Sequence, residues 1–266
     1  MSDMTVSFIG CGSMGGAIIR AVCRKYDPAM VTITAKHFEH AQNLAAGVQC
    51  SAVESNAKAA SAGRYVFIAV KPAYGADVMK EIDGYLRGDA VVISMAAGLS
   101  LEKLRAMTTG KVIRIMPNMP AQVGEAMTAL SCGSDVGDDD LANVTALLEC
   151  AGKVEKVDEK LMDCVTAVSG SGPAYVFMFI EALADAAVRF GMPRKQAYIY
   201  AAQTVKGSAA MVLEDGRCPA ALKDTVCSPG GTTIEGVAAL EKAGLRSAVQ
   251  EAVKAAYDKS VAMGKK

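Results

Sequence analysis

The chain has 266 residues, 52% of them hydrophobic, and carries 28 basic and 28 acidic side chains. This length favours two domains with a sizeable buried core. The zero net charge disfavours nucleic acid and anionic membrane surfaces as partners.

The first residues lack the basic and long apolar regions of a signal peptide, so we expect no export. The most continuous apolar run, residues 174–180, is far shorter than the roughly 20 residues that span a bilayer, so we expect no membrane span. The 8 cysteines form no Cys-x-x-Cys pair, which indicates reduced thiols in a cytoplasmic protein. The 2 histidines, His37 and His40, have no ligand cluster beside them, so we expect neither a metal site nor a Ser-His-Asp hydrolase.

The first half of the chain alternates strand-like and helix-like segments, which predicts βαβ units and a parallel sheet. The expected strands lie at residues 5–9, 30–34, 65–70, 90–94, 111–116 and 126–131, with helices at 17–22, 38–46, 72–85 and 138–150.

A glycine-rich turn stands between the first strand and the first helix. Its sequence, Gly10-Cys-Gly12-Ser-Met-Gly15, fits the G-x-G-x-x-G pattern in the context that dinucleotide binding requires. Gly10 permits the tight turn, Gly12 lets the backbone approach a pyrophosphate, and Gly15 lets helix and strand pack closely. The pattern predicts a Rossmann-type domain, in which Cys11 is a loop residue near the cofactor and not a reactive thiol.

The end of the second strand indicates which cofactor is preferred. NAD-preferring domains place an acid there for the ribose 2′-hydroxyl. This chain instead has Thr34, Ala35, Lys36 and His37, and Lys36 is suited to a 2′-phosphate. We therefore expect NADPH; the alternative is that Lys36 is an ordinary solvated lysine.

Two further segments follow expected parallel strands, where ligands of open α/β sheets collect. They are residues 69–72, Ala-Val-Lys-Pro, and residues 94–98, Ser-Met-Ala-Ala-Gly. Small residues there leave room for the nicotinamide and its ribose, although close packing alone would also select them.

After about Val157 the strand-like runs end and long Ala-rich helical segments follow. We expect a dinucleotide-binding domain over residues 1–157 and a helical substrate-binding and dimerisation domain over residues 158–266. Residues 174–180 are apolar on every side and need burial all round, more than one small helical domain provides. This predicts an obligate dimer through the C-terminal helices.

Three later segments are too particular for generic loops: residues 114–120, Arg-Ile-Met-Pro-Asn-Met-Pro; 168–175, Val-Ser-Gly-Ser-Gly-Pro-Ala-Tyr; and 222–236, which contain Ser-Pro-Gly-Gly-Thr-Thr-Ile. With the glycine turn and Val70-Lys-Pro, they resemble pyrroline-5-carboxylate reductase over essentially the whole chain, in the right order.

The resemblance implies an oxidoreductase that reduces L-Δ1-pyrroline-5-carboxylate to L-proline with NADPH, or with NADH, in the last step of proline biosynthesis. It also implies a homodimer whose helical domains interlock, and leaves a higher oligomer of dimers open. The implied substrate contacts are Glu159, Thr225, Ser228, Gly231, Thr232 and Thr233, and relatives often have Asn at the position of Thr225. The implied cofactor contacts are Gly10, Cys11, Gly12, Ser13, Met14, Gly15, Lys36, Asn56, Ala69, Val70, Lys71, Pro72, Met95, Ala96 and Ala97.

The chemistry of the residues agrees with this assignment. A cyclic imine that bears a carboxylate needs a hydride at carbon, a hydrogen bond or proton at nitrogen, and an anion site. Residues 228–233 lead into a helix whose free N–H groups and hydroxyls suit an anion, and we expect Thr233 to act at the nitrogen. A helix cap with Thr232 as N-cap is the alternative. Arg114 is either a carboxylate clamp or one half of a structural ion pair.

Two other functions remain alternatives. A 3-hydroxyacid or 6-phosphogluconate-type dehydrogenase shares this organisation but uses a lysine as general acid and base. Lys195, Lys206 and Lys223 do not stand in a glycine-rich helix-entry motif of that kind. A non-catalytic NADP-sensing protein would need the glycine turn but not residues 228–233.

Overall fold

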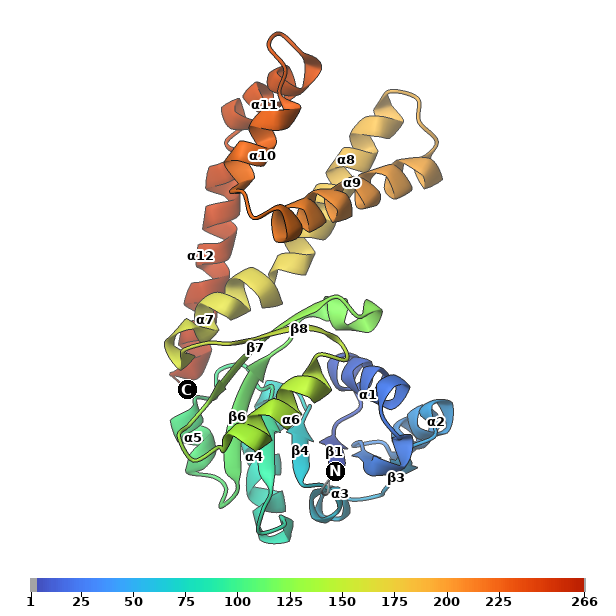
Figure 1. Ribbon diagram of the computed structural model, residues 1–266, viewed down its shortest axis with the longest axis vertical. Coiled ribbons are helices and arrows are strands. Elements are labelled where there is room, and N and C mark those ends of the chain that lie inside the picture. The colour runs from blue at the N-terminus through green and yellow to red at the C-terminus, as the bar shows by residue number, and fades with distance from the viewer. Residues whose placement is uncertain (1–3, 266) are drawn as a thin grey trace. The chain divides into compact units, whose positions relative to one another are not determined.

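A twisted sheet of eight strands forms the centre of the N-terminal part in the computed structural model, which describes residues 4–265 (Figure 1). The strand order is β3-β2-β1-β4-β5-β6-β7-β8, so the chain reverses its direction of travel between β1 and β4. The strands are β1 (Val6–Ile9), β2 (Val31–Thr34), β3 (Ser51–Ala52), β4 (Tyr65–Ile68), β5 (Val91–Ser94), β6 (Lys111–Met116), β7 (Ala126–Cys132) and β8 (Gly152–Lys156).

The strands from β1 to β6 are parallel, as the sequence pattern predicts. Strand β7 is an exception within the expected parallel sheet, because it runs antiparallel to β6 and pairs in parallel with β8. The segment from β6 to β7 holds only a short 3₁₀ turn, Met119–Val123, and parallel strands need a longer crossover. Strands β3 and β8 were not expected, because β3 has two residues and β8 is mostly polar.

Helices cover both faces of this sheet. Along β1, Phe8 packs with α1, α2 and α6, whereas Ile9 packs with α3, α4 and α5. This alternation follows from the two-residue period of a strand. The rings of Phe8 and Phe67 stack at 4.5 Å between centroids in the first of these cores. The helices are α1 (Ser13–Lys25), α2 (Phe38–Val48), α3 (Asn56–Ala62), α4 (Pro72–Ile82), α5 (Leu101–Arg105) and α6 (Asp138–Leu148).

The chain changes from strand to helix between Lys156 and Glu159, where the sequence composition changes. Its two compact units divide later: Met1–Ser171 with Ala256–Lys266 form one, and Gly172–Ala255 form the other. A π-helical turn, Thr166–Gly170, precedes the division. The α-helices that follow β8 are α7 (Met162–Val165), α8 (Gly172–Arg189), α9 (Arg194–Asp215), α10 (Pro219–Val226), α11 (Thr232–Lys242) and α12 (Leu245–Gly264).

In the second unit, α8 and α9 lie side by side as a hairpin (Figure 1). Its small core contains Ala184, Ala197 and Ala201. In contrast, Phe177 and Met178 on α8 are 63% and 69% exposed, so the burial that this segment needs is not met within one chain.

The helical stretch Glu159–Arg189 is long and apolar enough, by length and composition alone, to cross a membrane. We did not expect such a helix from the sequence, because residues 174–180 alone are too short to span a bilayer. In the structure these residues continue into helical turns on both sides, and the combined helix is long enough. A single helix of this kind is weak evidence for a membrane span.

Candidate functional site

The turn between β1 and α1 has the geometry that its glycines predict. Gly10 has a φ of +109°, and a Cβ there would lie 2.5 Å from the carbonyl oxygen of Ala69. A Cβ on Gly15 would lie 2.4 Å from the oxygen of Gly10 and 2.8 Å from the Cβ of Ala69. The turn, the first helix and the end of β4 therefore pack so closely that only glycine fits at these two positions.

Gly12 differs from the other two glycines, because a Cβ on it would meet no atom within 4 Å. It is the N-cap of α1, which has neither a side-chain cap nor an acidic residue in its first turn. The first N–H groups of this helix have no side-chain cap, and the space beside Gly12 is open, so an anion can bind here. The turn thus fits the pyrophosphate of a dinucleotide, with Ser13 exposed and Met14 half-buried beside it.

Cys11 is tied to the end of β2. Its thiol donates a hydrogen bond to the carbonyl oxygen of Thr34 at 3.3 Å, and the N–H of Gly10 donates to the same oxygen at 2.9 Å. Burial, and to a smaller extent the nearby Cys50, raise the pKa of Cys11 to about 12. Cys11 therefore stays a neutral thiol at physiological pH, as expected for a loop residue and not for a nucleophile.

The residues that follow β2 carry no carboxylate up to His37. Lys36 is exposed, and its ammonium nitrogen lies 5.6 Å from the centroid of the Tyr74 ring. Asn56, the first residue of α3, donates from Nδ2 to Glu81 at 2.9 Å. Lys36 is thus accessible, while the Asn56 side chain already has a partner within the chain.

The segments 69–72 and 95–97 follow the neighbouring strands β4 and β5. Pro72 begins α4, and the N–H of Ala96 donates to the Ser94 hydroxyl at 3.3 Å. A Cβ on Gly75 would lie 3.3 Å from the Cβ of Ala96, so close packing is one reason for the small residues here. Both segments stand at the carboxyl edge of the sheet, next to the point where strand order reverses, the usual position of a ligand in such folds.

Arg114 belongs to an ion pair. Its side chain is 6% exposed, and Nη1 donates to Glu159 Oε1 at 3.0 Å. The N–H of Leu101, at the start of α5, donates to the same oxygen at 2.6 Å. Of the two roles open to Arg114, the structure favours the ion pair, while the substrate contact implied for Glu159 stays a prediction.

Asn118 connects two of the segments that make this sequence distinctive, a connection that our site prediction did not include. Its Nδ2 donates to the hydroxyl and the carbonyl oxygen of Ser169 at 3.1 and 3.2 Å. Its Oδ1 accepts from the N–H of Met127 at 3.0 Å. Asn118 therefore holds the end of β6 against the π-helical turn that contains Ser169. The unusual motifs at residues 114–120 and 168–175 were the available signal.

In the second unit, residues 228–233 form a tight loop before α11. Gly230 has a φ of +67°, and the N–H of Gly231 donates to the Ser228 carbonyl oxygen at 3.0 Å. A Cβ on Gly231 would lie 2.3 Å from the Ser228 hydroxyl. Gly231 is the N-cap and Thr232 is the first helical residue, so the alternative that Thr232 caps this helix is wrong.

The hydroxyls of this loop are available to a ligand. Ser228 and Thr232 are exposed and Thr233 is half-buried, and within residues 4–265 their hydroxyls have no hydrogen-bond partner. Thr225 donates its hydroxyl proton to the carbonyl oxygen of Leu222 at 2.6 Å. The loop therefore presents three unpaired hydroxyls beside the free N–H groups of a helix of 11 residues.

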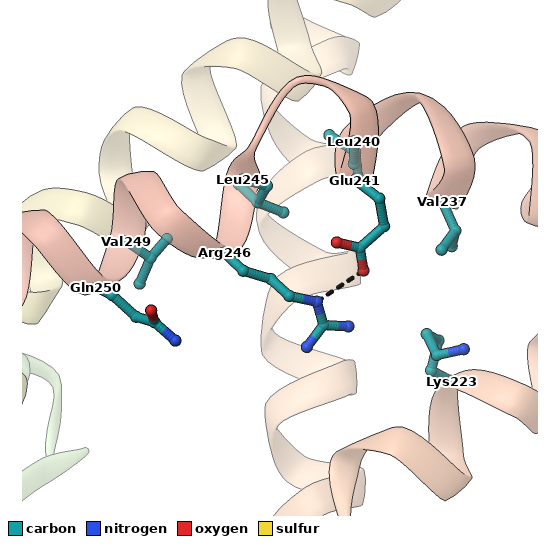
Figure 2. A pocket seen from close by; sticks show the side chains of 8 residues that line it. All are labelled: Lys223, Val237, Leu240, Glu241, Leu245, Arg246, Val249 and Gln250. Atoms are coloured by element: carbon teal, nitrogen blue, oxygen red, sulfur yellow. Dashed lines mark hydrogen bonds and ion pairs between the residues drawn. The ribbon is translucent and has the colours of Figure 1, made fainter.

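A cavity of about 430 Å³ lies between α10, α11 and α12 of the same unit (Figure 2). Arg246 and Glu241 form an ion pair at 2.6 Å along it, and much of the remaining lining is apolar. None of residues 228–233 lines it, so it is separate from the predicted substrate loop. The lining residues are Lys223, Val237, Leu240, Glu241, Leu245, Arg246, Val249 and Gln250.

Two family descriptions match the chain. Residues 5–98 match "NADP oxidoreductase coenzyme F420-dependent", which includes the glycine turn. Residues 159–263 match "Pyrroline-5-carboxylate reductase dimerisation", which includes the apolar helix α8 and the loop before α11.

Similar proteins cover the whole chain. The pyrroline-5-carboxylate reductase of Escherichia coli is 45% identical, over 99% of both chains. That of Synechocystis is 43% identical, over 99% of this chain and 100% of its own. The crystal structure of Plasmodium falciparum pyrroline carboxylate reductase with NADP bound has a TM-score of 0.89 and 33% identity, over 99% of both chains. The chain belongs to the pyrroline-5-carboxylate reductase family.

Proposed function

We propose that this enzyme reduces L-Δ1-pyrroline-5-carboxylate to L-proline with NADPH, as the last step of proline biosynthesis. The observation that carries the proposal is the loop before α11, where unpaired hydroxyls stand beside a free helix N-terminus. An NADP-binding protein without a reaction would have no need for such a loop. Identity of 45% to a pyrroline-5-carboxylate reductase over the whole chain supports the same substrate.

The substrate carboxylate binds at the start of α11 in this proposal. The first N–H groups of the helix and the hydroxyls of Ser228 and Thr232 donate to its oxygens. Gly231 keeps the loop tight enough to aim these donors, because a larger residue would collide with the Ser228 hydroxyl. The helix dipole supports the negative charge, so no arginine is required.

Thr233 acts at the ring nitrogen. During reduction the imine nitrogen becomes a basic amine, and a hydroxyl can donate to it or accept from its proton without titrating. The Thr233 hydroxyl has no partner within residues 4–265, so binding the nitrogen breaks no existing hydrogen bond. Its half-buried position holds it more firmly than an exposed hydroxyl would be held.

Residues 10–15 hold the pyrophosphate of the cofactor, and residues 69–72 and 95–97 hold the nicotinamide half. The bound nicotinamide supplies the hydride. Lys36 pairs with the 2′-phosphate of NADPH, because it is exposed and no carboxylate follows β2 to bind a free 2′-hydroxyl. NADH remains a weaker second cofactor.

The enzyme is a homo-oligomer, and residues 159–263 match a dimerisation family. We assign the interface to the C-terminal helices, because Phe177 and Met178 on α8 are exposed in the single chain. The apolar cavity between α10 and α12 also lies among these helices (Figure 2). Further assembly of dimers is compatible with this arrangement. We place the enzyme in the cytoplasm, where its 8 free cysteines stay reduced.

A steady-state assay tests the reaction. Purified enzyme with NADPH is given pyrroline-5-carboxylate, and NADPH oxidation and proline formation are measured together. A matched panel of 3-hydroxyacids with NADP tests the dehydrogenase alternative. Stoichiometric proline formation supports the proposal; turnover of a hydroxyacid without proline formation, or NADPH binding without any turnover, would contradict it.

A further inference from the structure

The last turn of α12 lies against α5 and against the segment that follows β5 (Figure 1). Gly98, directly after residues 95–97, has a φ of +81°. A Cβ on Gly98 would lie 3.2 Å from the carbonyl carbon and 3.3 Å from the carbonyl oxygen of Met263. A Cβ on Gly264 would lie 3.6 Å from the carbonyl oxygen of Gly98. The two backbones therefore approach each other closely at two glycines.

A hydrogen bond joins the same two elements. Lys103 on α5 is half-buried and donates from Nζ to the carbonyl oxygen of Gly264 at 2.7 Å. The last four carbonyl groups of a helix have no partner within the helix, and a cation near them is favourable. Within its bounds, α12 has no basic residue in its last turn. Lys103 therefore supplies this cation from another helix.

The end of α12 is itself fixed on the first compact unit. Ser260, which is 4% exposed, donates its hydroxyl proton to Asp163 Oδ1 on α7 at 2.6 Å. Residues from Ala256 onward belong to this unit, as do β5 and α5. The start of α5 has a second fixed point, because the N–H of Leu101 donates to Glu159. The end of α12 is therefore held independently of its contact with the segment after β5.

We propose that the last turn of α12 positions the nicotinamide of the cofactor, because it holds residues 95–97 in place through Gly98 and Lys103. The inference rests on the role proposed above for residues 95–97, which is to hold the nicotinamide half. Met263, Gly264 and Lys103 are positioning residues, since they act through this segment. A misplacement of about 1 Å at a group that aligns reacting atoms lowers the rate by up to about 100-fold, so a firm support here matters.

Ligand binding distinguishes positioning of the nicotinamide from support of the whole domain. The two ligands are NADPH and 2′-phospho-ADP-ribose, which is NADP without its nicotinamide, and titration calorimetry measures both affinities. The test variant lacks residues 263–266, which removes the contact with Gly98 and the acceptor of Lys103 but keeps Ser260. We expect its affinity for NADPH to fall about tenfold and its affinity for 2′-phospho-ADP-ribose to stay unchanged.

Lys103 offers a milder variant, which decides the question if the shortened enzyme does not fold. Lys103→Met removes the donor and keeps the length of the side chain, so NADPH affinity should fall about threefold, again with no change for 2′-phospho-ADP-ribose. Lys103→Arg retains a cationic donor and should bind both ligands like the wild type. Glu102→Gln, exposed on the same helical turn, is the control and should also bind both like the wild type. In the shortened enzyme, Lys103→Met should cause no further loss, because its acceptor is absent.

Three results would overturn the inference. They are an equal loss of affinity for both ligands, wild-type NADPH affinity in Lys103→Met, and losses from the shortening and from Lys103→Met that add in the combined variant. The titrations contain no pyrroline-5-carboxylate, so they do not depend on which substrate the enzyme reduces. An enzyme that shows the expected difference between the two ligands but forms no proline would contradict the proposed reaction and leave this inference standing.

Discussion

Hydroxyls and backbone N–H groups carry the proposed chemistry, and no titratable acid is required at the imine nitrogen. An imine nitrogen is basic enough to be partly protonated near neutral pH, so positioning and one hydrogen bond supply much of the catalysis. On this proposal the active site needs neither of the chain's 2 histidines, which lie in or near the start of α2.

Replacing Thr233 by valine tests the hydroxyl directly. Thr233→Val keeps the shape of the side chain and removes the group that bonds to the nitrogen, so kcat/KM for pyrroline-5-carboxylate should fall about 10- to 100-fold, or roughly 1.5–3 kcal/mol. NADPH affinity should not change. Thr233→Ser, which retains the hydroxyl, is the matched control and should retain most of the activity. A valine enzyme with wild-type kcat/KM would show that the hydroxyl has no catalytic role.

Lys36 is the second residue whose role can be isolated. Lys36→Glu places a carboxylate where NAD-preferring domains have one and removes the cation, so the ratio of kcat/KM for NADPH to that for NADH should fall or invert. Lys80→Glu, an equally exposed change on α4, should leave the ratio unaltered. A wild-type enzyme that favours NADH at least tenfold, a difference of about 1.4 kcal/mol, would contradict this role.

At the scale of elements, a buried charge network joins the amino ends of β4 and β6 to α6. Asp140, with 4% of its side chain exposed, accepts from Arg64 and from Lys111, both at 2.7 Å. Burial by itself would raise the pKa of Asp140, but the hydrogen bonds from Lys111 and Arg64 outweigh it and lower the pKa. The network stands at the edge of the sheet opposite the cofactor segments, so it stabilises the fold without contacting the site.

Asp140→Asn removes the negative charge between two cations and should lower the free energy of unfolding at pH 7 by about 2–3 kcal/mol, measured by urea denaturation. Because the folded pKa lies below the unfolded one, the carboxylate stabilises the fold fully above the unfolded pKa of about 3.9. The difference from wild type should therefore persist at pH 5 and disappear as the pH falls through the folded pKa. Asp139→Asn, exposed on the same helical turn, should show a much smaller loss. Equal losses in the two variants would contradict the role of Asp140.

At the scale of the whole molecule, we expect a second subunit to cover the exposed apolar side of α8. Phe177→Asp puts a charge where we expect the partner to pack, so it should abolish either the dimer or stable protein, measured by light scattering and by activity at the same concentration. Lys153→Asp, exposed on β8, is the control and should stay oligomeric. A fully active wild-type monomer at assay concentration would contradict the proposed dimer.

The sequence by itself determined the features that depend on neighbouring residues. The turn at Gly10 follows from a conformation that only glycine adopts, and the strands β1, β2, β4, β5 and β6 with the helices α1, α2 and α4 follow from local periodicity. The sequence also showed that no acidic residue follows β2 and that residues 174–180 of α8 are apolar on every side, because both features depend only on which residues occupy these segments. The loop before α11 stood out by its unusual glycines and hydroxyls, and its proposed substrate role was implied by the resemblance to pyrroline-5-carboxylate reductase.

Only the tertiary structure decided which residues from distant segments meet. Arg114 pairs with Glu159, and Asn118 bonds to Ser169. The tertiary structure also decided that β7 is antiparallel. This direction depends on the position of β7 beside β6 at the edge of the sheet and on the short connection between the two strands. The periodicity of a segment shows which of its side chains are buried. It does not show which other segment covers them, because that depends on how all the elements pack on the sheet.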